Sequence, residues 1–320
     1  MCLSKEARVY LIGHMYDLII IGAGPAGLGA SIYASRYKLN HVVIGKEIGG
    51  QVVEAWEIEN YAGIESISGK ELMEKFRKQT EDLGGVIIEA GVNKVNKIVD
   101  GFEIILEDGK KYEAKTIIFA LGMKPRKMNI PGEDKFLGKG ISYCATCDAM
   151  FFRGKDVVVI GGGDAAATAA IHLAEFANSV QLLYKEGTKI FEPAWEQQIA
   201  KTGKIAIDSF EKIQEILGED KVEGLVYEKA NQEKKELQIQ GVFIEIGSVP
   251  GVVVAKDLGV KTDEQGYIIV AQDQSTIIEN VYAAGDVTTG SNKFRQIITA
   301  VAEGAVAAGS VYKKLKLVKK

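Results

Sequence analysis

The sequence predicts an α/β fold, because one strand–turn–helix–strand pattern occurs twice along its 320 residues. The first copy covers residues 16–44 and the second covers residues 155–183, so the two copies lie 139 residues apart. In each copy a short apolar run of the buried-strand type leads through a glycine-rich turn into an alanine-rich helix. This order is typical of a dinucleotide-binding βαβ unit. Because the chain exceeds a typical single domain, we expect two Rossmann-like, three-layer domains.

The composition is that of an ordinary globular protein, with 47% hydrophobic and 26% charged residues. A net charge of −4 argues against a dedicated nucleic-acid-binding protein. No apolar run approaches the ~18 residues of a membrane span, and the N-terminus shows no signal-peptide core. Three cysteines, two of them in one C-x-x-C pair, fit a reducing compartment. We therefore expect a cytoplasmic protein without membrane or nucleic-acid partners.

The first glycine-rich turn begins soon after Met15, which we expect to be the natural start, with residues 1–14 as an extension. The turn at 22–27 follows the strand at 18–21 and opens a helix that runs to about Tyr37. Its glycines permit a tight turn, a close backbone approach to a pyrophosphate and close helix–strand packing. The phosphate would rest on the helix N-terminus, and an acid twenty residues later could bond ribose hydroxyls. The candidate residues are Gly22, Gly24, Pro25, Ala26, Gly27 and Glu47.

Two further glycine-containing segments follow the second strand, at Gly49-Gly50-Gln51 and around Asn60 in 59–63. Each either brings backbone close to a ligand or is an ordinary turn. Residues 70–83 then predict an amphipathic helix, and residues 86–120 are β-rich, with a hairpin turn at Asp108-Gly109. Residues 123–135 have the composition of a linker, so we expect the chain to cross between domains there.

The stretch after this linker carries a C-x-x-C pair, Cys144 and Cys147, followed at once by Asp148. Such a pair holds half of a zinc site, forms a redox disulfide or is merely structural. A zinc site needs two more ligands, and the remaining cysteine and the histidines are scattered. Disulfide exchange needs a thiolate and a proton for the departing sulfur, which the neighbouring carboxylic acid could deliver. The redox interpretation is therefore favoured.

The second copy repeats the first in order, with Ala166 where the first has its third glycine, a change that the pattern permits. A strand at 180–183 follows, and Lys185-Glu186 align with Lys46-Glu47 of the first copy. The candidate nucleotide-binding residues of this copy are Gly161, Gly163, Asp164, Ala165, Ala166, Lys185 and Glu186.

The remainder resembles the β-rich part of the first half, over residues 204–246, and ends in a second linker at 247–251. A strand over 281–287 then ends on Gly285-Asp286, and Arg295-Gln296 open an alanine-rich helix over 297–309. An acid at a strand end beside a helix N-terminus is suited to a ligand's hydroxyls and phosphate.

From Met15 to its end the chain resembles the low-molecular-weight thioredoxin reductases, class II of the FAD-dependent pyridine nucleotide-disulfide oxidoreductases. The resemblance rests on seven segments: GAGPAG (22–27), GGQ (49–51), ENYAG (59–63), CATCD (144–148), GGGDAA (161–166), AAGDV (283–287) and RQ (295–296). It implies a discontinuous FAD domain, 15–124 and 249–320. It also implies an inserted NAD(P)-binding-like domain, 125–248, which carries the C-x-x-C, and a homodimer.

The resemblance also implies residue roles. Gly22, Gly24 and Gly27 would cradle the FAD pyrophosphate, with Glu47 near the adenosine ribose. Gly50, Gln51 and Asn60 would lie near the flavin, Asp286 would hold the ribityl–phosphate region, and Arg295 with Gln296 the pyrophosphate and ring edge. Cys147 would face flavin C4a, Cys144 would attack the disulfide of a thioredoxin-like protein, and Asp148 would be the acid. Rotation of one domain against the other would let one C-x-x-C serve both partners.

The sequence departs from the family where NADPH-using members carry arginines that grip the 2′-phosphate. Residues 184–190 contain no arginine, and Glu186 occupies the ribose-reading position. A carboxylate about 4 Å from that phosphate would cost about 1–4 kcal/mol, which Lys185 and Lys189 could partly offset. Three donors therefore stay open: NADH, which suits Glu186 best, NADPH, and a redox protein such as a ferredoxin.

Two other functions also fit parts of the sequence. A small-molecule dithiol oxidase on the same scaffold would suit the missing arginines, although such relatives tend to carry His where Asp148 stands. A non-catalytic nucleotide-binding module would leave both cysteines idle. We expect a thioredoxin-disulfide reductase.

Overall fold

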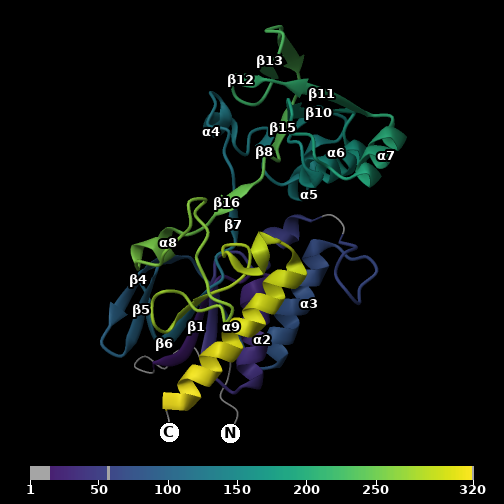
Figure 1. Cartoon of the computed structure of the whole chain (residues 1–320). Helices are drawn as coiled ribbons and strands as arrows, with labels where there is room; N and C mark the ends of the chain where they lie inside the picture. Colours follow the sequence, from purple (N-terminus) through teal and green to yellow (C-terminus); the bar gives the residue numbers. More distant parts are fainter. Residues whose placement is uncertain (1–14, 56–57, 319–320) are drawn as a thin grey trace. The chain divides into compact units, whose positions relative to one another are not determined.

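The computed structural model describes residues 15–55 and 58–318, so the expected extension at residues 1–14 lies outside the described residues. The chain divides into two units (Figure 1). The first unit takes the chain up to Lys124 and again from Pro250 onward, and the second is Pro125–Val249.

The first unit is built on a mixed sheet in which β6 is shared by parallel and antiparallel parts. β6 pairs in parallel with β1 and, through Ile117–Phe119, with β17, while its first half pairs antiparallel with β5. The order along the main path is β3-β2-β1-β6-β5-β4. The strands are β1 (Tyr16–Ile21), β2 (His41–Gly45), β3 (Val86–Glu89), β4 (Val92–Ile98), β5 (Gly101–Leu106), β6 (Lys111–Phe119) and β17 (Val281–Ala283).

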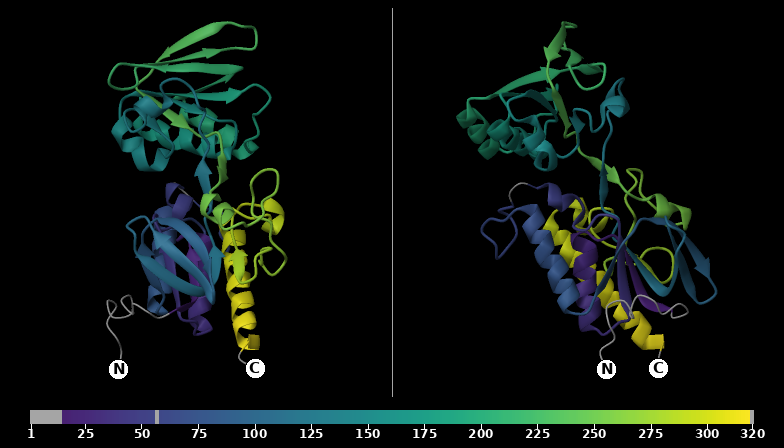
Figure 2. Two further views of the ribbon diagram at one scale, coloured as in Figure 1. Left: turned by 90° about the vertical axis from the view of Figure 1, so that its left-hand side faces the viewer. Right: turned by 180° about the vertical axis from the view of Figure 1, so that it is seen from behind.

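Alternate residues of β1 enter different cores, as a strand buried on both faces requires. Leu18 and Ile20 pack with the alanines of two helices, whereas Ile19 and Ile21 pack with the β4–β6 side. The helices on the first face are α2 (Pro25–Arg36), α3 (Gly69–Asp82) and α9 (Ile297–Val318), and Figure 2 shows α9 running alongside α2. The first unit therefore has three layers: the three helices, the parallel strands, and the β4–β5 part that packs on the other face of β1.

Local chemistry accounts for the limits of these helices. Pro25 is at the first position of α2, where its missing N–H costs nothing. α3 begins with a capping box in which Ser68 and Glu71 satisfy each other's backbone amides, and Gly84 follows its end at φ +88°. Short elements complete the unit: the 3₁₀ helices η1 (Gly50–Glu54) and η3 (Gly290–Lys293), and α8 (Val253–Asp257).

The second unit repeats the plan with a five-stranded parallel sheet of order β11-β10-β9-β15-β8 and a three-stranded antiparallel sheet of order β12-β13-β14. The five strands are β8 (Ile141–Ser142), β9 (Asp156–Ile160), β10 (Ser179–Lys185), β11 (Ile205–Phe210) and β15 (Gly241–Ile244). The three are β12 (Lys212–Leu217), β13 (Gly224–Glu228) and β14 (Lys234–Gln238). The helices are α4 (Glu133–Phe136), α5 (Ala145–Asp148), η2 (Ala149–Phe152), α6 (Asp164–Phe176) and α7 (Pro193–Thr202).

The chain crosses between the units through a two-stranded ribbon of β7 (Met123–Pro125) and β16 (Ser248–Pro250). The crossing expected in 123–135 therefore occurs at the start of that stretch. The rest of it is not a linker, because Met128 and Ile130 pack against the core of the second unit. The composition did not distinguish a linker from a folded loop, because prolines, glycines and charged residues are also common in a loop that surrounds a buried acid, here Glu133.

The predicted strands, the glycine-rich turns and the helices at 70–83 and 167–176 are confirmed within a few residues. Other helices differ from expectation: α9 continues to Val318 instead of ending near 309, and α7 and the short helices α4, α5 and α8 were not predicted. In the part of the chain that the structure describes, no helix combines the length and apolarity needed to cross a bilayer.

Candidate active site

The first glycine-rich turn is packed so closely that two of its glycines admit no side chain. A Cβ on Gly22 would lie 2.0 Å from the Ala120 carbonyl oxygen, and one on Gly27 would lie 1.8 Å from that of Gly22. At Gly24, the N-cap of α2, the nearest atom to a Cβ would be 3.9 Å away, and no side chain caps the helix. The backbone amides at the N-terminus of α2 thus have no side-chain cap, and such amides favour a phosphate.

The segment at 49–51 forms a second wall of this site. Gly49 and Gly50 have left-handed φ values of +94° and +56°, and the Gly49 amide donates to the Ala23 carbonyl at 2.8 Å. A Cβ on Gly50 would lie 3.5 Å from the Cα of Gly24. The structure therefore brings this segment against the first turn, while the side chains of Glu47 and Gln51 are exposed.

Residues from the other end of the chain reach the same site. Asn60 Nδ2 donates to Gln296 Oε1 at 3.1 Å. Gly285, at φ +82°, packs on the first turn of α2, since a Cβ there would lie 2.8 Å from that of Ala26. Asp286 follows directly. Predicted residues from both ends of the chain thus meet beside the N-terminus of α2, and we call this group of residues the cradle.

Asp286 is the titratable group of this cradle with the clearest perturbation. The pKa of its carboxyl is raised to about 6 by three effects together: burial, the largest, raises it, the Arg295 charge lowers it, and the Glu303 charge raises it. Glu303 was missed by sequence reasoning. Its position was nonetheless detectable, because helical spacing places it on the same face of α9 as the buried Ala300 and Ala307.

The two cysteines of the C-x-x-C pair form a disulfide, with their Cα atoms 5.4 Å apart. Cys144 is the N-cap of α5, and the Cys147 amide donates to Cys144 Sγ at 3.1 Å. The buried Ser142 hydroxyl accepts from the Cys144 amide at 2.9 Å and donates to its carbonyl at 3.1 Å. An amide aimed at Cys144 Sγ favours the thiolate over the thiol after reduction.

Asp148 is the last residue of α5, and Ala145 and Ala149 pack against α6 in the core of the second unit. Cys147 is exposed and Cys144 half-buried. In the described ranges, no group of three or more His, Cys, Asp and Glu side chains could hold a metal ion. The disulfide occupies both sulfur atoms of the pair.

A buried carboxylate supports the residue before the pair. Glu133 is 3% exposed and accepts hydrogen bonds from the Tyr143 hydroxyl at 2.5 Å and the Asn129 amide at 2.6 Å. The amides of Met128 and Ile130 also donate to it. This network was missed, because its acid lies in the stretch interpreted as a linker.

The second glycine-rich turn differs from the first in the atoms that pack against its glycines. A Cβ on Gly162 would lie 2.3 Å from the Thr188 carbonyl oxygen, so the loop after β10 packs directly on the turn. At Gly163 nothing lies within 4 Å of such a Cβ, which leaves the N-terminus of α6 open to a phosphate. The Asp164 carboxylate is engaged by the chain itself, because it accepts from the Glu192 amide at 2.8 Å. Ala165 is exposed and Ala166 buried.

The loop after β10 carries the residues that would read an adenosine ribose. Lys185 and Glu186 are exposed at the end of β10. Lys189 Nζ pairs with Glu196 at 2.5 Å and lies over the Phe191 ring. One of the two lysines that could offset Glu186 thus already has an acidic partner.

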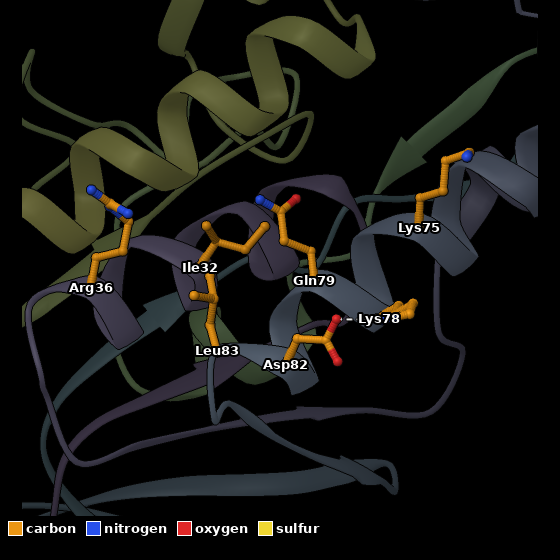
Figure 3. Close-up of a pocket in the computed structure, with 7 residues that line it drawn as sticks. All are labelled: Ile32, Arg36, Lys75, Lys78, Gln79, Asp82 and Leu83. Atoms are coloured by element: carbon orange, nitrogen blue, oxygen red, sulfur yellow. Dashed lines mark hydrogen bonds and ion pairs between the residues drawn. The ribbon is translucent and has the colours of Figure 1, made fainter.

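A separate hollow of about 360 Å³ lies between α2 and α3 and contains none of the predicted site residues (Figure 3). Ile32 and Leu83 supply its apolar surface, and Lys78 pairs with Asp82 at its edge.

Known proteins match the chain over nearly its whole length. The pyridine nucleotide-disulphide oxidoreductase family model matches residues 16–304. The thioredoxin reductase of Bacillus subtilis is 36% identical over 302 residues, which cover 93% of this chain and 94% of the relative.

Solved structures of thioredoxin reductases are also similar to this chain. The thioredoxin reductase of Lactococcus lactis superposes with a TM-score of 0.88 at 38% identity, over 94% of this chain and 99% of that one. A ferredoxin-flavin thioredoxin reductase from Clostridium acetobutylicum is 34% identical, with a TM-score of 0.51, over 95% of this chain and 100% of that one. The chain is therefore a member of the pyridine nucleotide-disulphide oxidoreductase family and, within it, of the thioredoxin reductases, which are FAD-dependent oxidoreductases.

Proposed function

We propose that the protein reduces the disulfide of thioredoxin or a thioredoxin-like protein, with electrons that reach Cys144 and Cys147 from a donor by way of FAD. The observation that carries the proposal is the Cys144–Cys147 disulfide, with the Cys147 amide directed at Cys144 Sγ. The likeness to thioredoxin reductases supports the choice of substrate.

In this proposal the first unit is the FAD domain. Gly22, Gly24, Pro25, Ala26 and Gly27 hold the pyrophosphate at the N-terminus of α2, Glu47 the adenosine ribose, and Asp286 the ribityl chain. The segment 49–51, Asn60, Gly285, Arg295 and Gln296 complete the cradle. When bound, FAD supplies the two-electron chemistry that links the donor to the cysteine pair. The N-terminus of α2, which no side chain caps, supports this fit.

The exchange with the partner then proceeds between thiols. The Cys144 thiolate attacks one sulfur of the partner's disulfide, that S–S bond breaks, and a mixed disulfide forms. The partner's other sulfur leaves and takes up a proton, which Asp148 supplies. Cys147 next attacks Cys144 in the mixed disulfide, which restores the Cys144–Cys147 bond and releases the second thiolate. One dithiol is oxidised and one disulfide is reduced.

The substitution Cys144→Ser tests this order of events. The variant should keep FAD, because no part of the cradle changes, and should lose turnover with thioredoxin. Cys2→Ser is the matched control, since the proposal assigns no role to the third cysteine, and it should retain full turnover. Thioredoxin reduction by the Cys144→Ser variant would overturn the assignment.

For the donor, we propose NADH at the second unit. Gly161, Gly163, Asp164, Ala165 and Ala166 form the turn at α6, with Lys185 and Glu186 beside the ribose. The ion pair of Lys189 with Glu196 supports NADH over NADPH, because a 2′-phosphate would have to compete with the Glu196 carboxylate for this cation. Anaerobic titration of the flavoprotein should show rapid loss of the long-wavelength flavin absorbance with NADH and little with NADPH.

A second candidate donor is a reduced iron–sulfur protein of the ferredoxin type. The absence of arginine from residues 184–190 favours it, as does the 34% identity with a ferredoxin-flavin thioredoxin reductase. In the same titration, bleaching by dithionite but by neither nicotinamide would select this candidate and reject NADH. Rapid bleaching by NADPH would reject both.

A further inference from the structure

Glu303 is a buried acid on a helix face that otherwise consists of small apolar residues. It is 6% exposed, and Ala300 and Ala307 lie one turn away on either side. Its Oε2 accepts hydrogen bonds from the Gly285 amide at 2.8 Å and from the Thr288 hydroxyl at 2.9 Å. Burial of a carboxylate is unfavourable unless such bonds replace its hydration. These two hydrogen bonds show that Glu303 holds the turn that follows β17.

The bonds continue through this turn. The Thr288 hydroxyl oxygen accepts from the Gly290 amide at 3.0 Å, so one carboxylate organises residues 285–290. Gly285 is the residue that packs against Ala26 in the first turn of α2. Asp286 is the next residue in the chain after Gly285. The position of Glu303 therefore determines where the Asp286 carboxyl lies relative to the α2 N-terminus.

Glu303 also acts on Asp286 through its charge. The charged groups that face Asp286 are Arg295 and Glu303. Together with burial, which has the largest effect, these charges set the pKa of Asp286 at about 6: burial and Glu303 raise it, and Arg295 lowers it.

We propose that Glu303 is a positioning residue for FAD: it holds the turn 285–290 that presents Asp286, and its charge adds to the effect of burial in making FAD binding sensitive to acid. This inference rests on the proposed assignment of Asp286 to the ribityl chain. A ribityl hydroxyl donates its hydrogen bond to the ionised carboxyl, so FAD binds the deprotonated form more tightly. Affinity is then independent of pH above the pKa of Asp286 and falls by up to about tenfold per pH unit below it.

The experiment measures FAD dissociation constants of deflavinated protein by flavin fluorescence, between about pH 5 and about pH 8, a range that spans the midpoint. The wild type should lose affinity below a midpoint near the pKa of about 6. Glu303→Gln removes the charge but keeps an acceptor oxygen, so its midpoint should move to lower pH. Thr288→Val keeps the charge but removes a bond of the turn, so it should weaken FAD binding by a similar factor at every pH.

Glu264→Gln is the matched control, because it removes an exposed acid from the same unit, and its binding should equal that of the wild type. Circular dichroism checks that each variant is folded. A wild-type affinity that does not change with pH overturns the inference, as does an unchanged midpoint in folded Glu303→Gln. If Glu303→Gln does not fold, a wild-type affinity that does not change with pH still overturns the inference. Failure of the wild type to bind FAD at any pH would instead overturn the proposed function itself.

Discussion

Asp286 follows Gly285 after β17, and burial raises the pKa of its carboxyl from 3.8 to about 6. When the pKa of an acid is higher in the folded state than in the unfolded state, the protonated acid favours folding and the ionised acid opposes it. Its contribution is fully present below pH 3.8 and is lost as the pH rises to about 6. The FAD-free protein therefore holds an ionised carboxylate at neutral pH at the expense of stability, which is common where a site is arranged for a ligand.

We expect Asp286→Asn to raise the free energy of unfolding of the FAD-free protein by about 1–3 kcal/mol near neutral pH, after allowance for partial solvent screening. Near pH 4 the gain should vanish, because Asp286 is then protonated in the wild type as well. Urea unfolding at the two pH values measures the difference. A variant less stable than the wild type at neutral pH would contradict the prediction, and Glu264→Gln should show no pH-dependent gain.

Tyr143, the neighbour of Cys144, donates its hydroxyl to the buried Glu133. Burial and the Glu133 charge raise the pKa of this phenol, so it remains protonated and donating at neutral pH. Loss of a hydrogen bond to a charged group costs about 1.5–3 kcal/mol. Tyr143→Phe should thus destabilise the second unit by about 1–2 kcal/mol, because three backbone amides still satisfy the carboxylate.

Trp195, which packs in the core of the second unit, reports this unfolding by fluorescence when Trp56 is replaced by Phe. Glu133→Gln is the companion variant and should cost more than Tyr143→Phe, since it weakens the bonds to all the donors of the network. Equal stability of Tyr143→Phe and the wild type would show that the hydroxyl contributes nothing.

At the scale of elements, α2 and α9 pack closely enough that their backbones touch through glycine. A Cβ on Gly304 would lie 2.1 Å from the Ala26 carbonyl oxygen and 3.0 Å from the Ala30 amide nitrogen. Neither atom can yield, since both belong to the backbone of a buried helix. By contrast, the nearest atom to a Cβ on Gly309 of the same helix is the Tyr37 hydroxyl at 3.6 Å, an ordinary contact.

Gly304→Ala should therefore destabilise the first unit by about 1–3 kcal/mol through overpacking. Gly309→Ala is the matched control and should be neutral or stabilising by up to about 1 kcal/mol, because alanine favours the helix. Thermal unfolding of the two variants measures the contrast. Identical shifts for both would refute the argument from close packing.

The two glycine-rich turns show how far an element can be predicted from its pattern. Both were expected to be alike, and both do join a parallel strand to an alanine-rich helix. Gly22 adopts φ +119°, whereas Gly161 does not have a left-handed φ, and Ala166 fits where Gly27 would admit no side chain. The pattern specified the order of elements, but the backbone of each turn depends on the strand that packs beside it.

At the scale of the whole molecule, each unit has its own cores, and the crossing occurs through the β7–β16 ribbon alone. Ligand binding stabilises only the part of a protein that binds it, by about 2.7 kcal/mol at a ligand concentration one hundred times the dissociation constant. We therefore expect two calorimetric transitions for the FAD-free protein. Added FAD should raise the temperature of one, and reduction of the Cys144–Cys147 disulfide should change the other.

The variant Asp286→Asn provides the control for this assignment, because its FAD-dependent shift should be smaller while the effect of reduction persists. A single cooperative transition, or a shift of both transitions by FAD alone, would contradict two independently stable units.

Sequence patterns were sufficient for features that depend on neighbours along the chain. Strands, the amphipathic helix and the glycine-rich turns follow from periodicity and backbone freedom within short windows, and the adjacency of Cys144, Cys147 and Asp148 is a property of the sequence itself. The repeat also indicated two similar domains, since each copy can bury its strands only against its own helix and sheet.

Other features depend on which distant segments meet, and no local pattern encodes that. Asn60 reaches Gln296 across 236 positions, Glu303 bonds the Gly285 amide 18 positions earlier, and Lys189 pairs with Glu196 from α7. Helical spacing can place an acid on a buried face, but its hydrogen bonds and its effect on a neighbouring carboxyl arise only when packing brings the distant segments together. The perturbed charge at the cradle and the balance of charge in the loop after β10 are therefore consequences of the tertiary structure.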